Sequence, residues 1–349
     1  MKKWFFLPLL CAALLCGCAR EPSAQERSAQ VFAMDTMMDI TVYADDTAAA
    51  ESALSAAEAE IHRLDGLLSR HDEASAVAVV NASSGAPVAV DEEVLSLLET
   101  AVSYSAQTGD AFDITLAPIM DAWNFTGDAP RVPSREELDA LLVHVGDERI
   151  VFGDGTVTLE PGMAVDLGGI AKGYASDRLA AVFEEQGIDS AMVSLGGNVY
   201  VRGAKPDGSP WRVAVEDPND PGAYLGVLSL TDAYAITSGG YQRYFTAPDG
   251  TVYQHILDPK TGYPVQSDLT SVSVVTRGGF GGQGTRADAY STALYVMGEQ
   301  AAVDFWRSQS MSFDMVLITR DGRVVYTPGL ADCFNEKDGT AYVYQLLAS

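Results

Sequence analysis

The apolar positions of the chain follow a helical period in some stretches and a strand period in others. Helical spacing predicts helices over residues 47–68, 92–107, 169–186 and 286–297. Ser134, followed three residues later by Glu137, is a capping box that opens a further helix. Strands are predicted over residues 31–44 (a strand pair or one bent strand), 191–195, 211–216, 225–230, 234–238, 252–257 and 271–275, with more strands after the last helix. Regular β-α-β alternation is missing, so we predict a mixed α+β fold rather than a doubly wound sheet.

The first 18 residues have the pattern of an export signal. Lys2 and Lys3 precede an apolar stretch over residues 4–15, which is shorter than the roughly 20 residues of a membrane-spanning helix. The Leu-Cys-Gly-Cys that follows resembles a bacterial lipoprotein box with Cys18 as the lipid acceptor; cleavage without lipidation is the alternative. We expect polar residues 19–30 to form a flexible tether and residues 31–349 to form a single domain. The protein is then expected in the bacterial cell envelope, outside the cytoplasm and lipid-anchored to a membrane.

Composition and charge narrow the class of ligand. With 47% hydrophobic and 20% charged residues, the chain fits a globular domain with a large core. Its net charge of -26 repels nucleic acid. A phosphate-bearing ligand would therefore need a few well-placed cations or a metal ion. Cys333 is the only cysteine after Cys18, which excludes a disulfide framework within the mature chain and a multi-cysteine metal site.

Two glycine-bearing segments could approach a ligand closely. Residues 166–174 lead straight into a helix, where free amide groups and Lys172 favour a phosphate. Their spacing matches neither a Walker loop nor a Rossmann fingerprint, and a plain strand-to-helix turn is equally compatible. Gly196, Gly197 and Asn198 follow an apolar strand, and paired glycines admit a ligand to the backbone. An ordinary hairpin turn is the simpler alternative.

Two further segments carry groups suited to catalysis. His255 leaves a strand just before the Asp258-Pro259 turn and could act as a general base near neutral pH, or be a surface histidine. Asp288 and Thr292 stand four apart, so their oxygens share one helical face and suit Mg²⁺. Helix capping and a helix-facing hydroxyl are the alternative there. The glycine-rich residues 278–284 lack the Gly-Lys-Ser/Thr ending of a phosphate loop, so we expect a flexible loop.

The order of these segments resembles the ApbE family of FAD:protein FMN transferases over about residues 31–330. The shared pattern comprises Met34-Asp35-Thr36, Leu68-Ser69 with Ser75 and Asn81, residues 109–115 with Pro118, Trp123 and Phe125, residues 166–174, residues 196–198, Thr237-Ser238-Gly239, residues 255–259 and residues 288–292. The resemblance implies an ApbE-like, T-fold-related architecture of two lobes, with mixed sheet and helices and the flavin site between the lobes.

The resemblance also implies a site. FAD, the substrate, is expected to contact Met34, His71, Ala111, Phe112, Asp113, Asp166, Lys172, Gly196, Gly197, Asn198 and Ile256. Mg²⁺ is expected on Asp288, Thr292 and the backbone carbonyl of Gly169. This agrees with the independent interpretation of Asp288 and Thr292 as an oxygen pair. The metal ion and Lys172 would offset the pyrophosphate charge in an acidic protein.

The implied reaction is metal-assisted phosphoryl transfer. A threonine hydroxyl of an exported or membrane redox protein, within a Ser/Thr-Gly-Ala-Thr-like motif, attacks the FMN-side phosphorus of FAD. AMP leaves and FMN stays joined to the acceptor through a phosphoester. Mg²⁺ would neutralise the developing charge and align the pyrophosphate. We expect His255 to accept the threonine proton and Asp258 to orient His255.

Three positions depart from the family pattern, and rival functions share its site. Asp35 stands where the family usually has Gly, Gly169 where Ala is usual, and His71 at an aromatic position beside the flavin, where an imidazole stacks less extensively. A Mg²⁺-dependent FAD pyrophosphatase that gives FMN and AMP would use the same groups with water in place of threonine. A lipid-anchored flavin-binding protein without catalysis and a structural envelope protein are the rivals from other classes.

Overall fold

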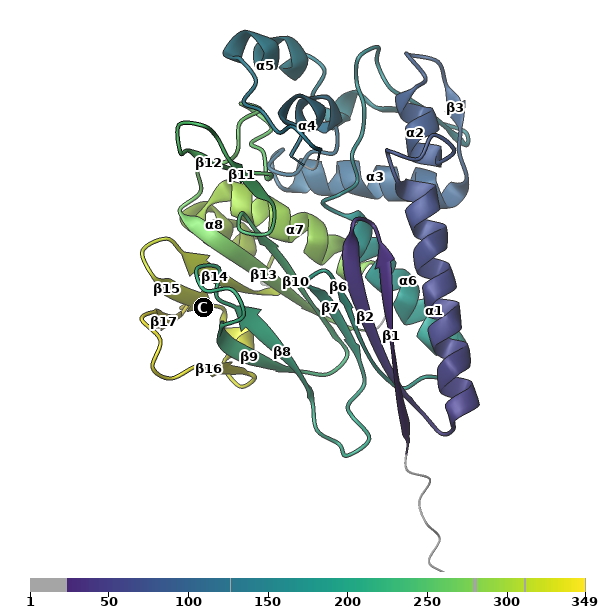
Figure 1. Cartoon of the computed structure of the whole chain (residues 1–349), viewed down its shortest axis with the longest axis vertical. Coiled ribbons are helices and arrows are strands. Elements are labelled where there is room, and N and C mark those ends of the chain that lie inside the picture. The colour runs from purple at the N-terminus through teal and green to yellow at the C-terminus, as the bar shows by residue number, and fades with distance from the viewer. Residues whose placement is uncertain (1–23, 126, 279–280, 311, 349) are drawn as a thin grey trace, which may run out of the picture.

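The computed structural model describes residues 24–125, 127–278, 281–310 and 312–348 (Figure 1). Its helices are α1 (Thr47–Leu68), α2 (Ala76–Asn81), α3 (Glu92–Gln107), α4 (Ala117–Trp123), α5 (Arg135–Leu142), α6 (Ala171–Glu185), α7 (Gln283–Met297) and α8 (Glu299–Ser308), with short 3-10 turns η1 (Asp147–Arg149) and η2 (Pro328–Leu330). Its strands are β1 (Gln25–Ala33), β2 (Thr36–Ala44), β3 (Val88–Ala89), β4 (Val151–Gly153), β5 (Thr156–Thr158), β6 (Ser190–Leu195), β7 (Asn198–Arg202), β8 (Trp211–Glu216), β9 (Tyr224–Leu230), β10 (Ala233–Gly239), β11 (Tyr244–Thr246), β12 (Val252–Gln254), β13 (Leu269–Arg277), β14 (Asp314–Thr319), β15 (Arg323–Tyr326), β16 (Phe334–Glu336) and β17 (Val343–Leu346).

A nine-stranded sheet in the order β1-β2-β6-β7-β10-β13-β14-β15-β17 forms the centre of the molecule. Neighbouring strands pair antiparallel except β15 and β17, which are parallel. Helices α1, α6 and α7 cover one face of this sheet over the main apolar core (Figure 1). The three-stranded sheet β16-β9-β8 packs on part of the other face over a second core. The predicted α+β class is confirmed.

A third, smaller core caps one end of the molecule. It joins α4, α5 and the β11–β12 hairpin around Ile119, Trp123, Leu138 and Leu257, and these elements lie at the same end as the tip of the β1–β2 hairpin (Figure 1). The indole N–H of Trp123 donates to the carbonyl of Gly262 at 2.8 Å, which fixes the turn after the 255–259 segment to the cap. The molecule therefore has a large body and a small cap, in line with the expected two lobes.

The expected tether is wrong for residues 25–30, because β1 begins at Gln25 and pairs with β2 along its whole length. The segment looks like a linker in sequence because β1 is an edge strand whose outward residues are polar. Gln30, for example, donates to Asp39 of β2 at 2.7 Å. Hydrogen-bonded polar pairs stabilise this exposed face of the sheet. The segment therefore lacks the regular alternation of apolar and polar residues by which a strand is recognised in sequence. The predicted strand pair over residues 31–44 is confirmed as the β1–β2 hairpin.

Two other predicted boundaries shift. The strand expected over residues 252–257 ends at Gln254, because His255 and the residues after it form turns stabilised by their own hydrogen bonds. The helix expected from residue 286 begins three residues earlier, at Gln283, because Asp177 of α6 accepts from the amides of Gly284 and Thr285 and so caps α7. Residues 279–280 of the glycine-rich loop lie outside the described residues.

Helices α6 and α7 cross almost backbone to backbone at two glycines. A Cβ at Gly173 would lie 2.3 Å from the carbonyl oxygen of Gly284, and one at Gly284 would lie 2.6 Å from the carbonyl oxygen of Gly173. The approach lets the amide N–H of Gly173 donate to Asp288 of α7 at 2.7 Å. This crossing fixes the relative position of the two helices that carry Lys172, Asp288 and Thr292.

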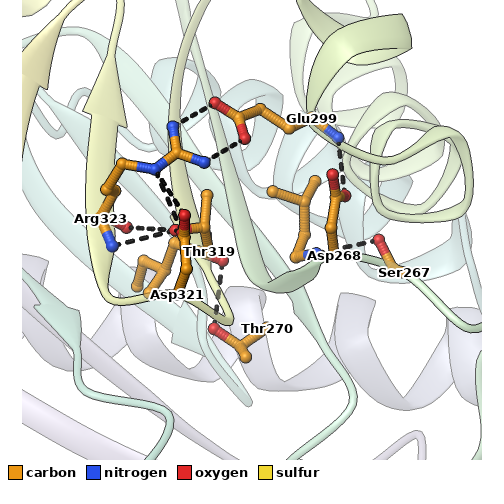
Figure 2. Close-up of polar contacts among 9 residues, drawn as sticks. Ser267, Asp268, Thr270, Glu299, Thr319, Asp321 and Arg323 are labelled. Carbon is orange, nitrogen blue, oxygen red and sulfur yellow. Dashed lines mark hydrogen bonds and ion pairs between the residues drawn. The ribbon is translucent and has the colours of Figure 1, made fainter.

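A polar network holds the start of α8 against the β14–β15 hairpin (Figure 2). The guanidinium of Arg323 binds both carboxylate oxygens of Glu299, at 2.5 and 2.6 Å, and also Asp321 at 3.0 Å. Asp268 accepts from the backbone amide of Glu299 at 2.9 Å and caps the helix. Every charge of the network has a partner, so we assign it a structural role.

The structure also bears on the expected membrane anchor. In the part of the chain that it describes, no helix combines the length and the apolar character needed to cross a membrane. Cys18, the predicted lipid acceptor, lies outside the described residues. Lipid anchoring therefore stays a prediction from the sequence.

Candidate active site

A large open cavity lies between the body and the cap. Its volume is about 1050 Å³, at the upper end of the roughly 300–1,000 Å³ range of small-molecule sites, so it suits a large ligand. The β1–β2 turn, the end of α1, the start of α6 and the middle of α7 supply the walls on the side of the body. Leu116, Met120 and Asn124 supply the wall on the side of the cap.

Most residues that the sequence nominated meet at this cavity. Those that line it are Met34, His71, Ala111, Phe112, Asp113, Asp166, Gly169, Lys172, Gly196, Gly197, His255, Ile256, Asp288 and Thr292. Asn198 and Asp258 do not line it. The convergence of segments more than 250 residues apart makes this cavity the candidate active site, while the individual ligand contacts stay predictions.

The turn between β1 and β2 holds two residues in the left-handed region. Met34 has φ 47° and Asp35 has φ 58°, which is the pattern of a two-residue hairpin turn that needs positive φ at both positions. Aspartate tolerates this conformation better than most residues, which explains how it can replace the usual glycine. The carboxylate of Asp35 pairs with Arg243 at 2.9 Å, and the same guanidinium donates to the carbonyl of Asp35 at 2.9 Å. The extra negative charge is thus compensated by a cation.

His255 is held by the backbone of Arg243. Its Nδ1 lies 3.1 Å from the carbonyl oxygen of Arg243, and its amide N–H donates to the same oxygen at 3.1 Å. A carbonyl only accepts, so Nδ1 carries the proton and Nε2 of the neutral ring is left as an acceptor. Burial lowers the pKa of His255 to about 4, so the ring is neutral at pH 7. A neutral histidine with a fixed tautomer can accept a proton at Nε2.

Asp258 does not orient His255, so this prediction is wrong. One carboxylate oxygen of Asp258 accepts from the amide of Lys260 at 2.9 Å, and the other from the hydroxyl of Thr261 at 3.2 Å. Aspartate before proline at the start of a turn commonly binds the backbone two residues on, and here that local role takes both oxygens. The carbonyl of Arg243 takes the orienting role instead.

Two cationic side chains that line the cavity, Arg70 and Lys172, differ in whether their charge is already paired. Arg70 pairs with Asp166 at 2.8 Å and with Asp121 at 2.8 Å, so its charge is already compensated. Lys172 contacts only the carbonyl oxygen of Gly168, at 3.4 Å, and makes no ion pair within the described ranges. Lys172 is therefore the lining cation that is available to an anionic group of a ligand.

Asp288 is a buried carboxylate that meets the cavity without a cationic partner. Asp288 is only 3% exposed. Its carboxylate accepts hydrogen bonds from the amide of Gly173 at 2.7 Å and from the side chain of Asn198 at 3.0 Å. Across the described ranges, no lysine or arginine pairs with it. Asn198, predicted to contact the ligand, is instead buried behind Asp288 and orients it. Asp288 thus reaches the cavity as a positioned acceptor.

The oxygen atoms around Asp288 fit a hard cation that takes most of its ligands from water and from a bound phosphate rather than from the protein. Thr292 lines the cavity one helical turn on, with its hydroxyl 3.2 Å from that of Ser238. No group of three or more His, Cys, Asp or Glu that could hold a metal ion alone occurs among the residues described. Mg²⁺ commonly uses one or two protein carboxylates plus water and substrate phosphates. Asp288, Thr292 and Gly169 therefore fit Mg²⁺ bound together with a phosphate-bearing ligand.

Steric crowding explains why this chain has glycine rather than alanine at position 169. A Cβ there would lie 3.1 Å from the ring of Phe112 and 3.5 Å from the hydroxyl of Thr292. Alanine would therefore require the Phe112 ring to give way by a few tenths of an ångström. In this chain glycine leaves that ring in place against the cavity wall.

Two neighbouring carboxyl groups lie near the cavity: Asp113 is partly buried on its wall, and Asp147 is buried close to Asp113. Asp113 accepts from the amide and the hydroxyl of Thr115, at 2.6 and 2.5 Å. Asp147, 3% exposed, has a buried Oδ2 that finds no hydrogen-bond partner among the described residues. Burial raises the pKa of Asp113, and burial with the nearby Asp113 charge raises the pKa of Asp147 to about 8. Asp147 is thus protonated at neutral pH, which lowers the negative charge beside the cavity.

The family follows from comparison with known proteins. The model of the ApbE family matches residues 34–317. This chain belongs to the ApbE family. It is 33% identical to the FAD:protein FMN transferase of Treponema pallidum over 94% of both chains, and 31% identical to that of Salmonella typhimurium over 90% of this chain and 92% of the relative. The predicted family and the transferase class are confirmed.

Solved ApbE structures confirm the fold. The ApbE protein of Thermotoga maritima aligns with a TM-score of 0.80 at 33% identity, over 90% of this chain and all (100%) of that one. The apo form of the flavinyl transferase ApbE of Pseudomonas stutzeri aligns with a TM-score of 0.78 at 28% identity, over 90% and 98% of the two chains. The large mixed sheet and its helices are thus the ApbE architecture.

Sequence reasoning missed two cations of the cavity. Arg70 follows the Leu68-Ser69 segment directly and could have been suspected from that neighbourhood. Arg243 has no local signal, because its partner Asp35 lies 208 residues away. Only the fold brings these two residues together.

Proposed function

We propose that this chain is a Mg²⁺-dependent FAD:protein FMN transferase. It joins FMN to a threonine of an exported or membrane redox protein and releases AMP. The observation that carries the proposal is the meeting of three features in one cavity: the Nε2 acceptor of His255, the unpaired cation of Lys172, and the oxygen pair of Asp288 and Thr292. The relatives that match most of the chain are named for this activity.

Lys172 and the start of α6 receive the pyrophosphate of FAD. Helix α6 begins at Ala171, so the positive end of its dipole and the Lys172 ammonium lie at the same wall of the cavity. The amides of Ala171 and Gly173 already donate to Leu167 and Asp288, which leaves the Lys172 ammonium as the group that binds the phosphates. Asp288, Thr292 and Gly169 hold Mg²⁺, which supplies charge neutralisation at the phosphates when it is bound. The protein itself offers few free positive groups, because Arg70 and Arg243 are already paired.

His255 takes the proton of the incoming hydroxyl. The threonine Oγ forms a bond to the FMN-side phosphorus, the bond from that phosphorus to the bridging oxygen breaks, and AMP leaves with that oxygen. The hydroxyl proton moves to Nε2 of His255, whose Nδ1–H stays hydrogen-bonded to the Arg243 carbonyl. The shielded position of His255 keeps it neutral and ready for this step.

The acceptor and the location complete the proposal. The acceptor threonine stands in a Ser/Thr-Gly-Ala-Thr-like motif, and Cys18 carries a lipid that anchors the enzyme outside the cytoplasm. The support for the anchor is the sequence pattern of residues 1–18. Mass spectrometry of the N-terminal peptide from membranes tests it, because a Cys18 without diacylglycerol would contradict lipidation.

The activity is tested with the purified protein, FAD, Mg²⁺ and a domain that bears the acceptor motif. We expect the acceptor to gain the mass of FMN, with one AMP released per adduct, and we expect EDTA to stop both. His255→Gln should lower the rate by about 10²–10⁴-fold, the usual contribution of a general base. His62→Gln, on the exposed face of α1, is the matched control and should retain full activity.

Three outcomes separate the rivals. AMP and free FMN at the same rate with and without acceptor, and no adduct, would establish a pyrophosphatase instead. FAD that stays intact with Mg²⁺ and acceptor, yet binds, would establish a flavin-binding protein without catalysis. Absence of FAD binding by fluorescence would contradict both flavin functions. In the transferase, Asp288→Ala should abolish metal-dependent AMP release and leave the fold intact by circular dichroism.

A further inference from the structure

The exposed face of the β1–β2 hairpin changes character at its cavity end. Four residue pairs face each other across the strands on this face: Glu26 with Tyr43, Ser28 with Thr41, Gln30 with Asp39, and Phe32 with Met37. The first three pairs are polar and hydrogen-bonded, at 2.5, 2.9 and 2.7 Å. The fourth pair is apolar, although Phe32 is 63% and Met37 is 51% exposed. Along this exposed face of the hairpin, the Phe32–Met37 pair is therefore the one pair that is apolar instead of polar.

That place borders the candidate active site. The residues between Phe32 and Met37 form the hairpin turn, and Met34, Asp35 and Thr36 line the cavity. The turn is held in place by the Asp35–Arg243 ion pair and by the donation from Arg243 to the Asp35 carbonyl. The apolar pair thus stands directly beside the rim of the cavity, at the base of a turn that is held in place.

Nothing on the neighbouring strand covers the pair. In the sheet, Met38 pairs with Leu195, the last residue of β6, so the position beside Met37 is the Gly196–Gly197 turn. Two glycines present no side chains there. A pair of large apolar side chains that is open on both sides differs from single exposed apolar residues, which are normal on protein surfaces.

We propose that Phe32 and Met37 form a docking surface for the acceptor protein. The proposal rests on the proposed transferase function, because a protein substrate that places a hydroxyl in the cavity contacts the surface around the cavity, and this pair lies on that surface. Asp39, two residues after Met37, carries a carboxylate without a cationic partner among the described residues, while the charge of Asp35 is compensated by Arg243. The matching acceptor surface is therefore an apolar side chain with neutral or basic groups beside it. Phe32 and Met37 belong to this docking surface and contact no reacting atom.

The size and charge of the docking surface favour this occupant. A stable dimer of the chain would need an interface of roughly 1,000 Å² or more, far beyond two side chains, whereas a transient enzyme–substrate contact needs less. The Asp39 carboxylate and the net charge of -26 oppose contact with an anionic membrane surface. A substrate protein that binds briefly and leaves fits both observations.

The test compares Phe32→Thr/Met37→Thr with the control Ser28→Ala/Thr41→Ala, which alters the second polar pair of the same face. We expect the KM for the acceptor domain to rise about tenfold in the first variant and to stay unchanged in the control. The KM for FAD and the rate with a short peptide that carries only the acceptor motif should stay unchanged in both. Met37→Gln alone, a smaller change, should raise the KM for the domain by about threefold.

The outcomes are distinguishable. If the parent protein modifies neither domain nor peptide, the proposed function fails. If the parent modifies the domain and Phe32→Thr/Met37→Thr does so with the same KM, the docking surface is refuted while the transferase stands. A parent dimer that this variant dissociates in sedimentation, or weaker binding to phosphatidylglycerol vesicles with an unchanged KM for the domain, would assign the surface to another occupant and overturn the proposal.

Discussion

Replacing Gly173 by alanine probes the helix crossing that positions the active-site groups. The new methyl group would lie 2.3 Å from the carbonyl oxygen of Gly284 and 2.6 Å from Cβ of Asp288, about 1 Å inside normal contact. Because Gly284 contributes backbone at this contact, no side-chain rotation relieves the clash. Helix α6 must move away from α7, and the Gly173 amide then loses its hydrogen bond to Asp288.

The magnitude follows from three contributions. Overpacking costs about 1–3 kcal/mol, and loss of a hydrogen bond to a buried carboxylate costs roughly 1.5–3 kcal/mol. The better helix propensity of alanine offsets about 0.8–1 kcal/mol. We therefore expect Gly173→Ala to lower the free energy of unfolding by roughly 2–5 kcal/mol. FAD affinity should also fall, because Lys172 and Asp288 move apart.

Gly66→Ala is the matched control. Gly66 lies in the last turn of α1, and a Cβ there meets nothing within 4 Å. The same substitution should therefore stabilise the protein, by up to about 1 kcal/mol. Urea unfolding followed by circular dichroism measures both. Unfolding free energies that change in the same direction in the two variants would refute the proposed backbone crossing.

Three further predictions concern charge and pH. Asp147 stays protonated in the folded state up to about pH 8 but ionises near pH 4 when unfolded, so it lowers the free energy of unfolding as pH rises between these values. In urea unfolding, the free energy of unfolding of Asp147→Asn should therefore fall less between pH 5 and pH 8 than that of the parent, by roughly 1–3 kcal/mol. An equal fall in the two proteins would contradict a buried, protonated Asp147. Because the pKa of His255 is about 4, the acid limb of kcat/KM should lie near pH 4, and a limb at pH 6–7 would show an exposed histidine. Lys172→Met should weaken FAD binding about tenfold in a fluorescence titration. Lys260→Met, on an exposed turn, is the control and should leave FAD affinity unchanged. Equal effects of the two substitutions would argue against a direct contact between Lys172 and FAD.

The sequence predicts the fold class and most of the cavity because those features rest on local patterns. Helical and strand periods reveal the mixture of elements, and segments such as 166–174 and 288–292 carry chemistry that is readable without a structure. Their order along the chain then points to one family. The cavity brings together almost all of these segments.

The failures have a different physical origin. Asp258 looks like a partner for the nearby His255, but its carboxylate satisfies its own turn, and a backbone carbonyl does the orienting. Asn198 looks like part of a ligand-binding turn, but it is buried and supports Asp288. The Asp35–Arg243 pair depends on a contact that only the folded chain creates. Hydrogen-bond competition and long-range pairing leave no periodic trace in a sequence.

Strand β1 also acts as a spacer of fixed length. Its nine residues rise about 3.3 Å each, so the cavity end of the hairpin stands about 30 Å from Gln25. With the proposed lipid on Cys18, the seven residue steps from Cys18 to Gln25 can span at most about 25 Å. The rim of the cavity can then stand no farther than about 55 Å from the membrane surface. Acceptor threonines on domains held farther out than this would escape modification, whatever their motif.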